Sequence, residues 1–154
     1  MEWYWDRELR EKARAYVEEH QLISVMNDTK WDRFRRAMEK EMPFPPAYHL
    51  KTLFDPPEEI RSFKDEKEVW YGGDYDREAF AGWLYYLIEW VQVVPRYWTM
   101  EGGRLVHHPV LHDAEPQLRA ILEQYRIPYA CRDHIYTIRG YLPSGEGLEC
   151  ELRR

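Results

Sequence analysis

The fold class is best predicted from residues 113–141, which read DAEPQLRAILEQYRIPYACRDHIYTIRGY. Asp113 is a typical N-cap residue, and Pro116 fits the first turn of a helix. Apolar side chains then follow at positions 118, 121, 122 and 125, which is the spacing of one helix face. Two extended runs come next, at 127–131 and 135–141, on either side of a turn. The stretch therefore predicts a helix followed by an antiparallel pair of strands.

Two further helices are predicted upstream. The first covers residues 4–20, where apolar side chains recur at helical spacing. The second begins at one of the N-cap candidates Asn27, Asp28 and Thr29, where Thr29 and Asp32 fit a capping box, and it ends at Pro43. Its apolar face consists of Trp31, Phe34, Met38 and Met42. Residues 22–25 between the two helices are interpreted as an apolar connector.

The middle of the chain has weaker signals. Strands are expected at 48–54 and at 69–71, and the second of these ends at a Gly-Gly turn. Residues 77–94 fit both a helix and a strand, so we divide them into a short helix at 77–84 and a strand at 86–94. Residues 96–112 are predicted to form a loop or an irregular hairpin.

This order of elements predicts an α+β fold. We expect a two-layer domain with a mostly antiparallel sheet, covered on one face by helices, and an extra N-terminal helix. Six side chains should pack on that sheet face: Trp31, Phe34, Met38, Leu118, Ile121 and Leu122. We divide the chain into an N-terminal helical extension (1–25), a single α+β domain (26–145) and a polar tail (146–154).

Composition narrows the function classes. The 154 residues include 7 Trp, 12 Tyr and 5 Phe, and the net charge is -6. This acidic balance argues against a nucleic-acid partner and against attraction to an anionic membrane. No run of about 18 apolar residues is present, and the N-terminus does not resemble a signal peptide. We therefore expect a cytoplasmic protein.

Two groups of residues are weighed as catalytic or metal sites. His107, His108 and His112 have ligand chemistry, but neighbouring histidines in a loop cannot easily face one ion. We therefore expect solvated loop histidines, with no metal and no cofactor. Cys131 lies three residues before His134, but such a pair needs contact in space and an orienting third group. A structural thiol is the favoured interpretation, and Cys150 has no partner pattern.

Glu89 is the remaining candidate for acid–base chemistry. It lies between Ile88 and Trp90 in an apolar strand. A carboxylate there is either buried with a raised pKa or solvated on the open face of the sheet. Alternation places Glu89 opposite its two neighbours and favours the solvated position.

The charge distribution indicates a protein-binding segment. Residues 43–80 carry five basic and nine acidic side chains, so four of the six excess negative charges lie here. Aromatic side chains are interleaved with the later ones, and such a surface would attract a basic partner. The proposed contact residues are Glu58, Glu59, Asp65, Glu66, Glu68, Trp70, Tyr71, Asp74, Tyr75 and Asp76. The alternative is a solvated loop beside core aromatics.

Three short segments together resemble a family of small, acidic, uncharacterised bacterial proteins. They are Met26–Trp31, the Ile88–Val91 strand, and a closing hairpin that ends in Ile138–Tyr141. The resemblance covers roughly residues 26–145, and it implies no catalytic residues. Small acidic α+β proteins of this kind are often immunity proteins, which bind and neutralise a toxin.

The leading functional hypothesis is a non-catalytic protein-binding protein of the immunity type. One alternative is a small enzyme or metal-binding protein that uses His107, His108 and His112. Another is a small-molecule binder with an aromatic pocket. The oligomeric state and the identity of the partner stay open at this point.

Overall fold

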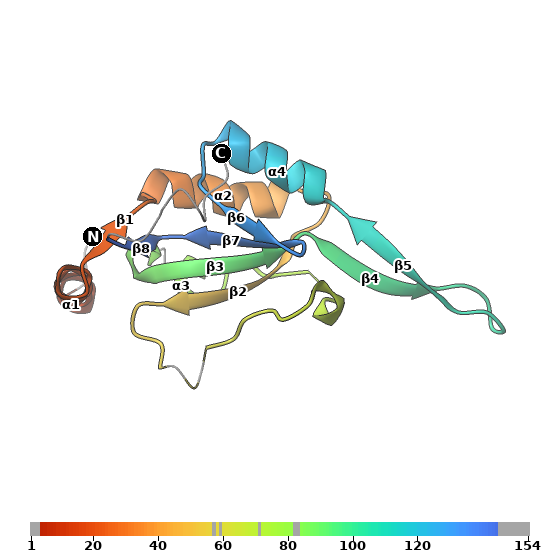
Figure 1. Cartoon of the computed structure of the whole chain (residues 1–154), viewed down its shortest axis with the longest axis horizontal. Helices are drawn as coiled ribbons and strands as arrows, with labels where there is room; N and C mark the ends of the chain where they lie inside the picture. The colour runs from red at the N-terminus through yellow and green to blue at the C-terminus, as the bar shows by residue number, and fades with distance from the viewer. Residues whose placement is uncertain (1–3, 57, 59, 71, 82–83, 145–154) are drawn as a thin grey trace.

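Two helices cover one face of an antiparallel sheet in the computed structural model of the chain (Figure 1). The sheet has the strand order β2 (Ala47–Thr52), β3 (Ile88–Val94), β7 (Ile135–Arg139), β6 (Ala130–Arg132). The covering helices are α2 (Asp28–Lys40) and α4 (Glu115–Gln124). Residues 4–56, 58, 60–70, 72–81 and 84–144 are described. The predicted two-layer α+β fold is confirmed.

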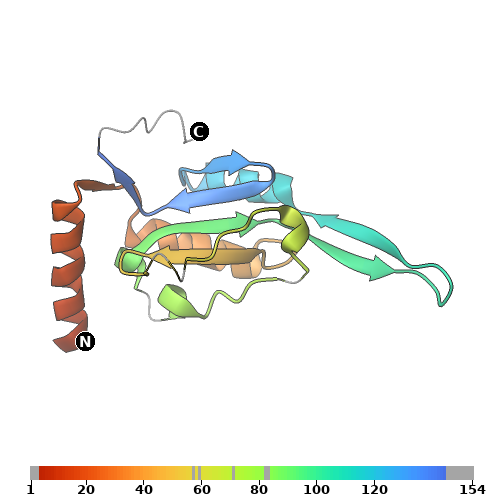
Figure 2. The same ribbon diagram turned by 60° about the horizontal axis from the view of Figure 1, so that its bottom comes forward.

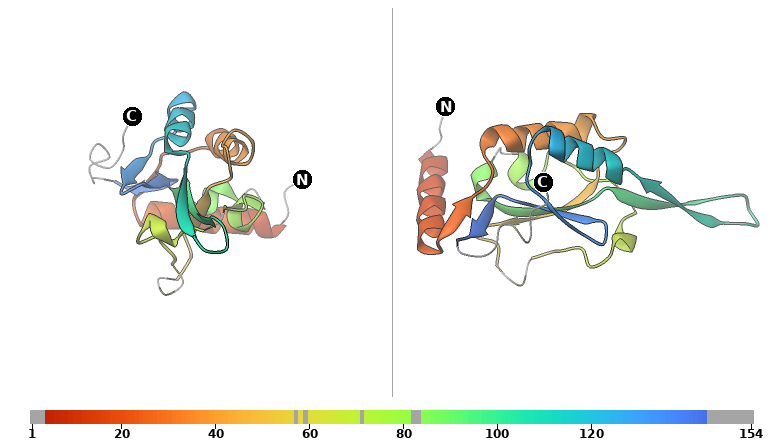
Figure 3. Two further views of the ribbon diagram at one scale, coloured as in Figure 1. Left: turned by 90° about the vertical axis from the view of Figure 1, so that its right-hand side faces the viewer. Right: turned by 45° about the horizontal axis from the view of Figure 1, so that its top comes forward.

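Smaller elements flank this sheet. β1 (Leu22–Ser24) pairs with β8 (Tyr141–Pro143), and β4 (Arg96–Glu101) pairs with β5 (His108–Asp113). α1 (Tyr4–Glu19) lies beside the β1–β8 pair at one end of the molecule (Figure 3). Among the described residues there are also three single-turn helices: η2 (Glu66–Glu68), α3 (Glu78–Ala81) and η3 (Tyr85–Leu87).

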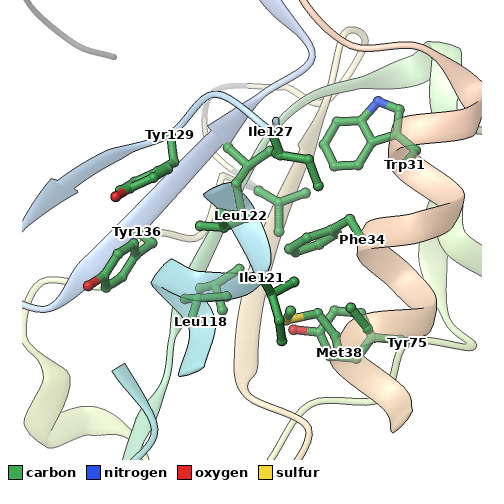
Figure 4. Packing of buried hydrophobic residues seen from close by; sticks show 14 of the residues in the cluster. Trp31, Phe34, Met38, Tyr75, Leu118, Ile121, Leu122, Ile127, Tyr129 and Tyr136 are labelled. Carbon is green, nitrogen blue, oxygen red and sulfur yellow. The ribbon is translucent and has the colours of Figure 1, made fainter. Parts of the chain in front are cut away.

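The core lies between the sheet and the two covering helices. All six side chains predicted to pack there are buried, with at most 7% of their surface exposed. Figure 4 shows them facing one another from α2 and α4, with Tyr129 and Tyr136 on the sheet side. Burial of large apolar side chains at this density is the main source of stability for a domain of this size.

Both covering helices begin close to their predicted starts. The N-cap of α2 is Asn27, whose side chain accepts a hydrogen bond from Lys30 N at 2.8 Å. The capping box at Thr29 was therefore placed two residues too late. Asp113 precedes the geometric N-cap of α4 by one residue, and its carboxylate accepts a hydrogen bond from Glu115 N at 2.9 Å.

Several predicted strands needed correction. Residues 22–25 are no mere connector, because β1 forms a ladder with β8. Val69 and Trp70 belong to no strand, and Tyr71 lies outside the described residues. The run 135–141 divides into β7 and β8 at Gly140, since β8 turns away to pair with β1. Residues 96–112, predicted as a loop or an irregular hairpin, form with Asp113 a hairpin that has six paired positions.

This β4–β5 hairpin projects from the body of the molecule as an arm (Figure 2). It is attached at its base, where Ala114 N donates to Pro95 O at 2.9 Å and Trp98 N donates to Val69 O at 3.3 Å. The segment between β2 and α3 crosses the sheet face opposite the helices (Figure 3, left). None of the helices among the described residues is both long enough and apolar enough to span a membrane.

Candidate functional site

A pocket of about 630 Å³ opens along the edge of β2, which we call the edge pocket. β2 is the outermost strand of its sheet, and none of the described strands pairs with its far side. The floor is formed by residues 47–50 of β2. One wall consists of Asp55, Arg61, Phe63 and residues 68–70, and the other of residues 72–74, Arg77 and Glu78.

The second wall is held against β2 by a close backbone approach. Gly73 N donates to Pro45 O at 3.0 Å, and a Cβ on Gly73 would lie 2.5 Å from Pro46 O. Only glycine fits at that distance. Two hydroxyl groups complete the attachment: Tyr48 Oη donates to Asp74 O at 2.7 Å, and Tyr75 Oη donates to Pro46 O at 2.9 Å.

The first wall is anchored on the outer face of the sheet. The ring of Phe63 stacks on that of His49, with the ring centroids 3.9 Å apart and the planes nearly parallel. Phe63 N also donates to Gln92 Oε1 at 2.9 Å. Val69 is buried in a small cluster with Val94 and Ile135. These contacts position the neighbouring Glu68 and Trp70 at the pocket.

Negative charge predominates in the edge pocket. Four carboxylates line it, those of Asp55, Glu68, Asp74 and Glu78, against the guanidinium groups of Arg61 and Arg77. Arg77 pairs with Asp74 at 3.0 Å. The pocket is therefore suited to a cationic ligand group.

The most informative carboxylate of the edge pocket is that of Glu78. Glu78 is exposed as a residue, but partial burial of its carboxyl raises the pKa above the usual value, the nearby Asp55 raises it further, and Arg61 lowers it. Among the described residues, none forms an ion pair with Glu78 within 4.0 Å. Its φ of +55° is uncommon for a residue with a side chain. An added positive charge would stabilise this carboxylate in its ionised form.

The edge pocket also perturbs two other side chains. Burial and the nearby Arg61 lower the pKa of His49, whereas the nearby Glu68 raises it. Burial raises the pKa of Tyr48, and the carboxylates of Glu78 and Asp74 raise it further. Lowering the His49 pKa favours a neutral ring, so the carboxylates keep their charge excess near neutral pH.

Nine of the ten predicted contact residues fall into three groups. Glu68, Trp70 and Asp74 line the edge pocket, and Trp70 is 49% exposed. Glu58, Asp65 and Asp76 are exposed but do not line it, and Asp76 pairs with Arg35 of α2. Glu59, Tyr71 and the side chain of Glu66 lie outside what the structure describes.

The predicted position of Tyr75 is wrong. It was predicted as an exposed anchor for a partner, but only 2% of its surface is exposed. Its ring packs near Tyr48 and Phe34 in the main core. Its hydroxyl reaches Pro46 O inside the fold, so Tyr75 supports the wall of the pocket and does not line it.

Sequence reasoning missed the basic residues and the histidine of the pocket, namely His49, Arg61 and Arg77. No local pattern distinguishes them from other surface residues. They meet because β2 is an edge strand, and because the segments before and after residue 71 run along it from both sides.

The histidine group lies on the arm. His112 stacks on Tyr97 with ring centroids 4.5 Å apart, and its Nε2 lies 2.8 Å from Thr99 Oγ1. His108 begins β5 and is exposed, as is His107 before it. A search of the described residues for three or more His, Cys, Asp or Glu in metal-binding proximity found no such group.

The Cys131–His134 pairing is not what the structure shows. His134 Nδ1 lies 2.9 Å from Glu115 Oε2, and Glu115 Oε1 accepts a hydrogen bond from Tyr136 Oη at 2.8 Å. These contacts join the start of α4 to the β6–β7 hairpin. Cys131 is half-buried and forms no disulfide with a described residue, and Cys150 lies outside the described residues.

Glu89 lies on the sheet face away from the helices, where it forms an ion pair with Lys51 of β2. Its side chain is 22% exposed. The carboxylate is thus neither fully solvated nor buried without a partner, and the ion pair accounts for its place in an apolar strand.

Comparison with known proteins gives a family and no function. A model of a family of unknown function, DUF6678, matches residues 13–145. The chain belongs to the DUF6678 family. The match confirms an uncharacterised family, and it starts within α1, earlier than the resemblance at residue 26. Neither the curated proteins nor the solved structures include a match to this DUF6678 chain.

Proposed function

We propose that this DUF6678 protein is a non-catalytic binding protein that takes a basic segment of a protein partner into the edge pocket. The observation that carries the proposal is the charge of the pocket, where four carboxylates face two guanidinium groups. The Glu78 carboxylate, whose pKa is raised, would be stabilised in its ionised form by a partner's lysine or arginine. Charge complementarity of this kind speeds encounter and selects the partner.

Two further features support a protein partner over a free ion. Trp70 is 49% exposed at the pocket, and tryptophan is enriched among the residues that dominate binding energy. The open edge of β2 presents backbone groups that an extended segment can pair with. An extended segment with alternating basic and apolar residues matches both features.

The test uses two synthetic peptides, one alternating Arg and Leu and the other alternating Glu and Leu. Titration calorimetry with the full chain should show binding of the first, with an affinity that falls as salt rises. The Glu peptide should not bind. Equal binding of both peptides, or binding of neither, would contradict the proposal.

A narrower form of the proposal is an immunity protein that neutralises a toxin with a basic surface. The acidic pocket and the small α+β fold of this chain support it by analogy. When the product of a toxin-like neighbouring gene stops the growth of host cells, co-expression of this chain should restore their growth. The same experiment with Glu68→Lys and Glu78→Lys together should fail to restore it, and equal rescue by both chains would reject this form.

A further inference from the structure

The arm exposes apolar side chains where the rest of the described surface has few. Five large hydrophobic residues are exposed, and three of them lie on the arm: Met100 (53%), Leu105 (98%) and Val106 (66%). Residues 102–107, which we call the arm tip, join β4 to β5 far from the body of the molecule (Figure 2). Clustered exposure of this kind is typical of an interaction site.

The arm tip has a defined shape. Gly102 has a φ of +128°, and a Cβ there would lie 2.0 Å from Val106 O. Val106 N donates to Gly103 O at 3.3 Å, and the paired strands below extend the ladder to Glu101 and His108. Leu105 therefore stands outward on an ordered turn, which lowers the entropy cost of inserting it into a partner.

The charges of the arm tip complement those of the edge pocket. Arg104 precedes Leu105, and His107 and His108 follow Val106. The one nearby carboxylate, Glu101, is turned toward its own hairpin, 3.4 Å from Thr99 Oγ1 and 3.9 Å from His112 Nε2. The tip thus combines one arginine with two apolar residues, which is the composition proposed above for a ligand of the edge pocket.

We infer that the arm tip of one copy docks into the edge pocket of a second copy and thereby controls access to that pocket. The inference rests on the proposed function, because both use the same site. Arg104 would face the carboxylates of Glu68 and Glu78, while Leu105 packs on Trp70. A twofold arrangement lets each arm reach the other copy's pocket, so two equal contacts form together. A partner protein must displace the arm.

Self-association tests the inference directly. In sedimentation velocity of the full chain at low salt, the average mass should rise with concentration from 18.9 kDa toward twice that value. Leu105→Asp should keep the mass at that of one chain. The matched control is Ile23→Asp, which adds the same charge at an exposed residue of β1 and should associate like the wild type. A wild type that stays at one chain mass overturns the inference, as does equal association of the two variants.

Charge reversal adds an independent test. Arg104→Glu and Glu68→Lys should each abolish self-association when studied alone. A mixture of the two variants should associate again, because every arm then meets a pocket of opposite charge. Association in the mixture no stronger than in either variant alone would overturn the contact between the arm tip and the edge pocket.

The Arg-Leu peptide separates this inference from the proposed function. If the peptide binds the wild type and Leu105→Asp with equal affinity, and the wild type does not self-associate, only the arm contact is refuted. If the peptide binds neither chain, the proposed function fails, and self-association is judged from the sedimentation data alone. The inference expects tighter peptide binding to Leu105→Asp, because its pocket is no longer occupied by an arm.

Discussion

The two sides of β2 show how one strand can serve stability and recognition at once. On the helix side, Tyr48 and Leu50 pack on a core whose side chains are almost fully buried. Along the outer edge, the same strand borders a pocket with charged walls and an exposed Trp70. Apolar burial stabilises the fold, and the unpaired edge leaves room for a partner. Changes on the two sides should therefore affect different measurements.

The largest expected effect is on the core. Leu122→Ala removes a fully buried side chain from α4 and should lower the free energy of unfolding by about 2–5 kcal/mol. Denaturant unfolding measures this loss. Binding of the Arg-Leu peptide by the folded fraction should not change. A loss of unfolding free energy no larger than that caused by substituting an exposed residue would show that α4 does not pack as described.

Trp70→Ala should act on binding. The loss of affinity should be about 2 kcal/mol if this side chain is an anchor, and it should appear mainly as faster dissociation. The melting temperature should stay close to that of the wild type, because half of this side chain is already exposed. A lower melting temperature with unchanged rate constants would instead assign Trp70 a purely structural role.

Gly73→Ala should affect both the stability of the fold and the binding of the peptide. An added Cβ would meet Pro46 O at 2.5 Å and Tyr48 Cδ1 at 2.9 Å, so the wall of the pocket must shift. We expect a stability loss of about 1–3 kcal/mol and weaker peptide binding. Gly103→Ala is the matched control for stability alone, because Gly103 lies in the arm tip and no atom beyond its chain neighbours lies within 4 Å of its added Cβ. Equal stability of the two variants would argue against the close approach at Gly73.

Glu115 should make part of the stability depend on pH. Burial alone would raise its pKa, but hydrogen bonds from His134 and Tyr136 hold it below the usual value. A lowered folded-state pKa means that the stabilisation is present above the unfolded value of about 4.5 and is lost as pH falls through the folded value. Unfolding curves of the wild type and Glu115→Gln should therefore converge in acid and separate near neutral pH. Curves that stay parallel throughout would contradict this role.

The core was predictable because its signals are local. Helical spacing identified Trp31, Phe34 and Leu122 without knowledge of their neighbours, since burial of one helix face needs only a periodic pattern. The strand with Val91 was predicted from its β-branched residues for the same reason.

The edge pocket was predictable only in part. Its acidic and aromatic wall was visible as a charge excess around Trp70, but Tyr75 was assigned to the surface although it is buried. His49 and Arg61 join this wall through the sheet order, and a single sequence does not show which strand lies at the edge. The close approach of Gly73 to the start of β2 was equally hidden, because it depends on the carbonyl of Pro45, which is distant in the sequence.

The pH dependence of binding sharpens the role of Glu78. Its raised pKa means that this carboxylate takes up a proton at a higher pH than an ordinary glutamate does. Affinity for the Arg-Leu peptide should therefore fall as pH decreases toward and below that pKa, since the neutral carboxyl no longer attracts a cation. Glu78→Gln should bind more weakly near neutral pH and lose this part of the pH dependence.

The most direct test of the account compares two pairs of acidic residues that change the net charge equally. Glu68→Gln with Glu78→Gln neutralises the edge pocket, whereas Glu58→Gln with Asp65→Asn neutralises exposed carboxylates outside it. Calorimetry with the Arg-Leu peptide should show a loss of about tenfold in affinity, ~1.4 kcal/mol, for the pocket pair and little change for the outer pair. Equal losses for both pairs would mean that only the overall charge attracts the peptide, which would contradict the edge pocket as the binding site.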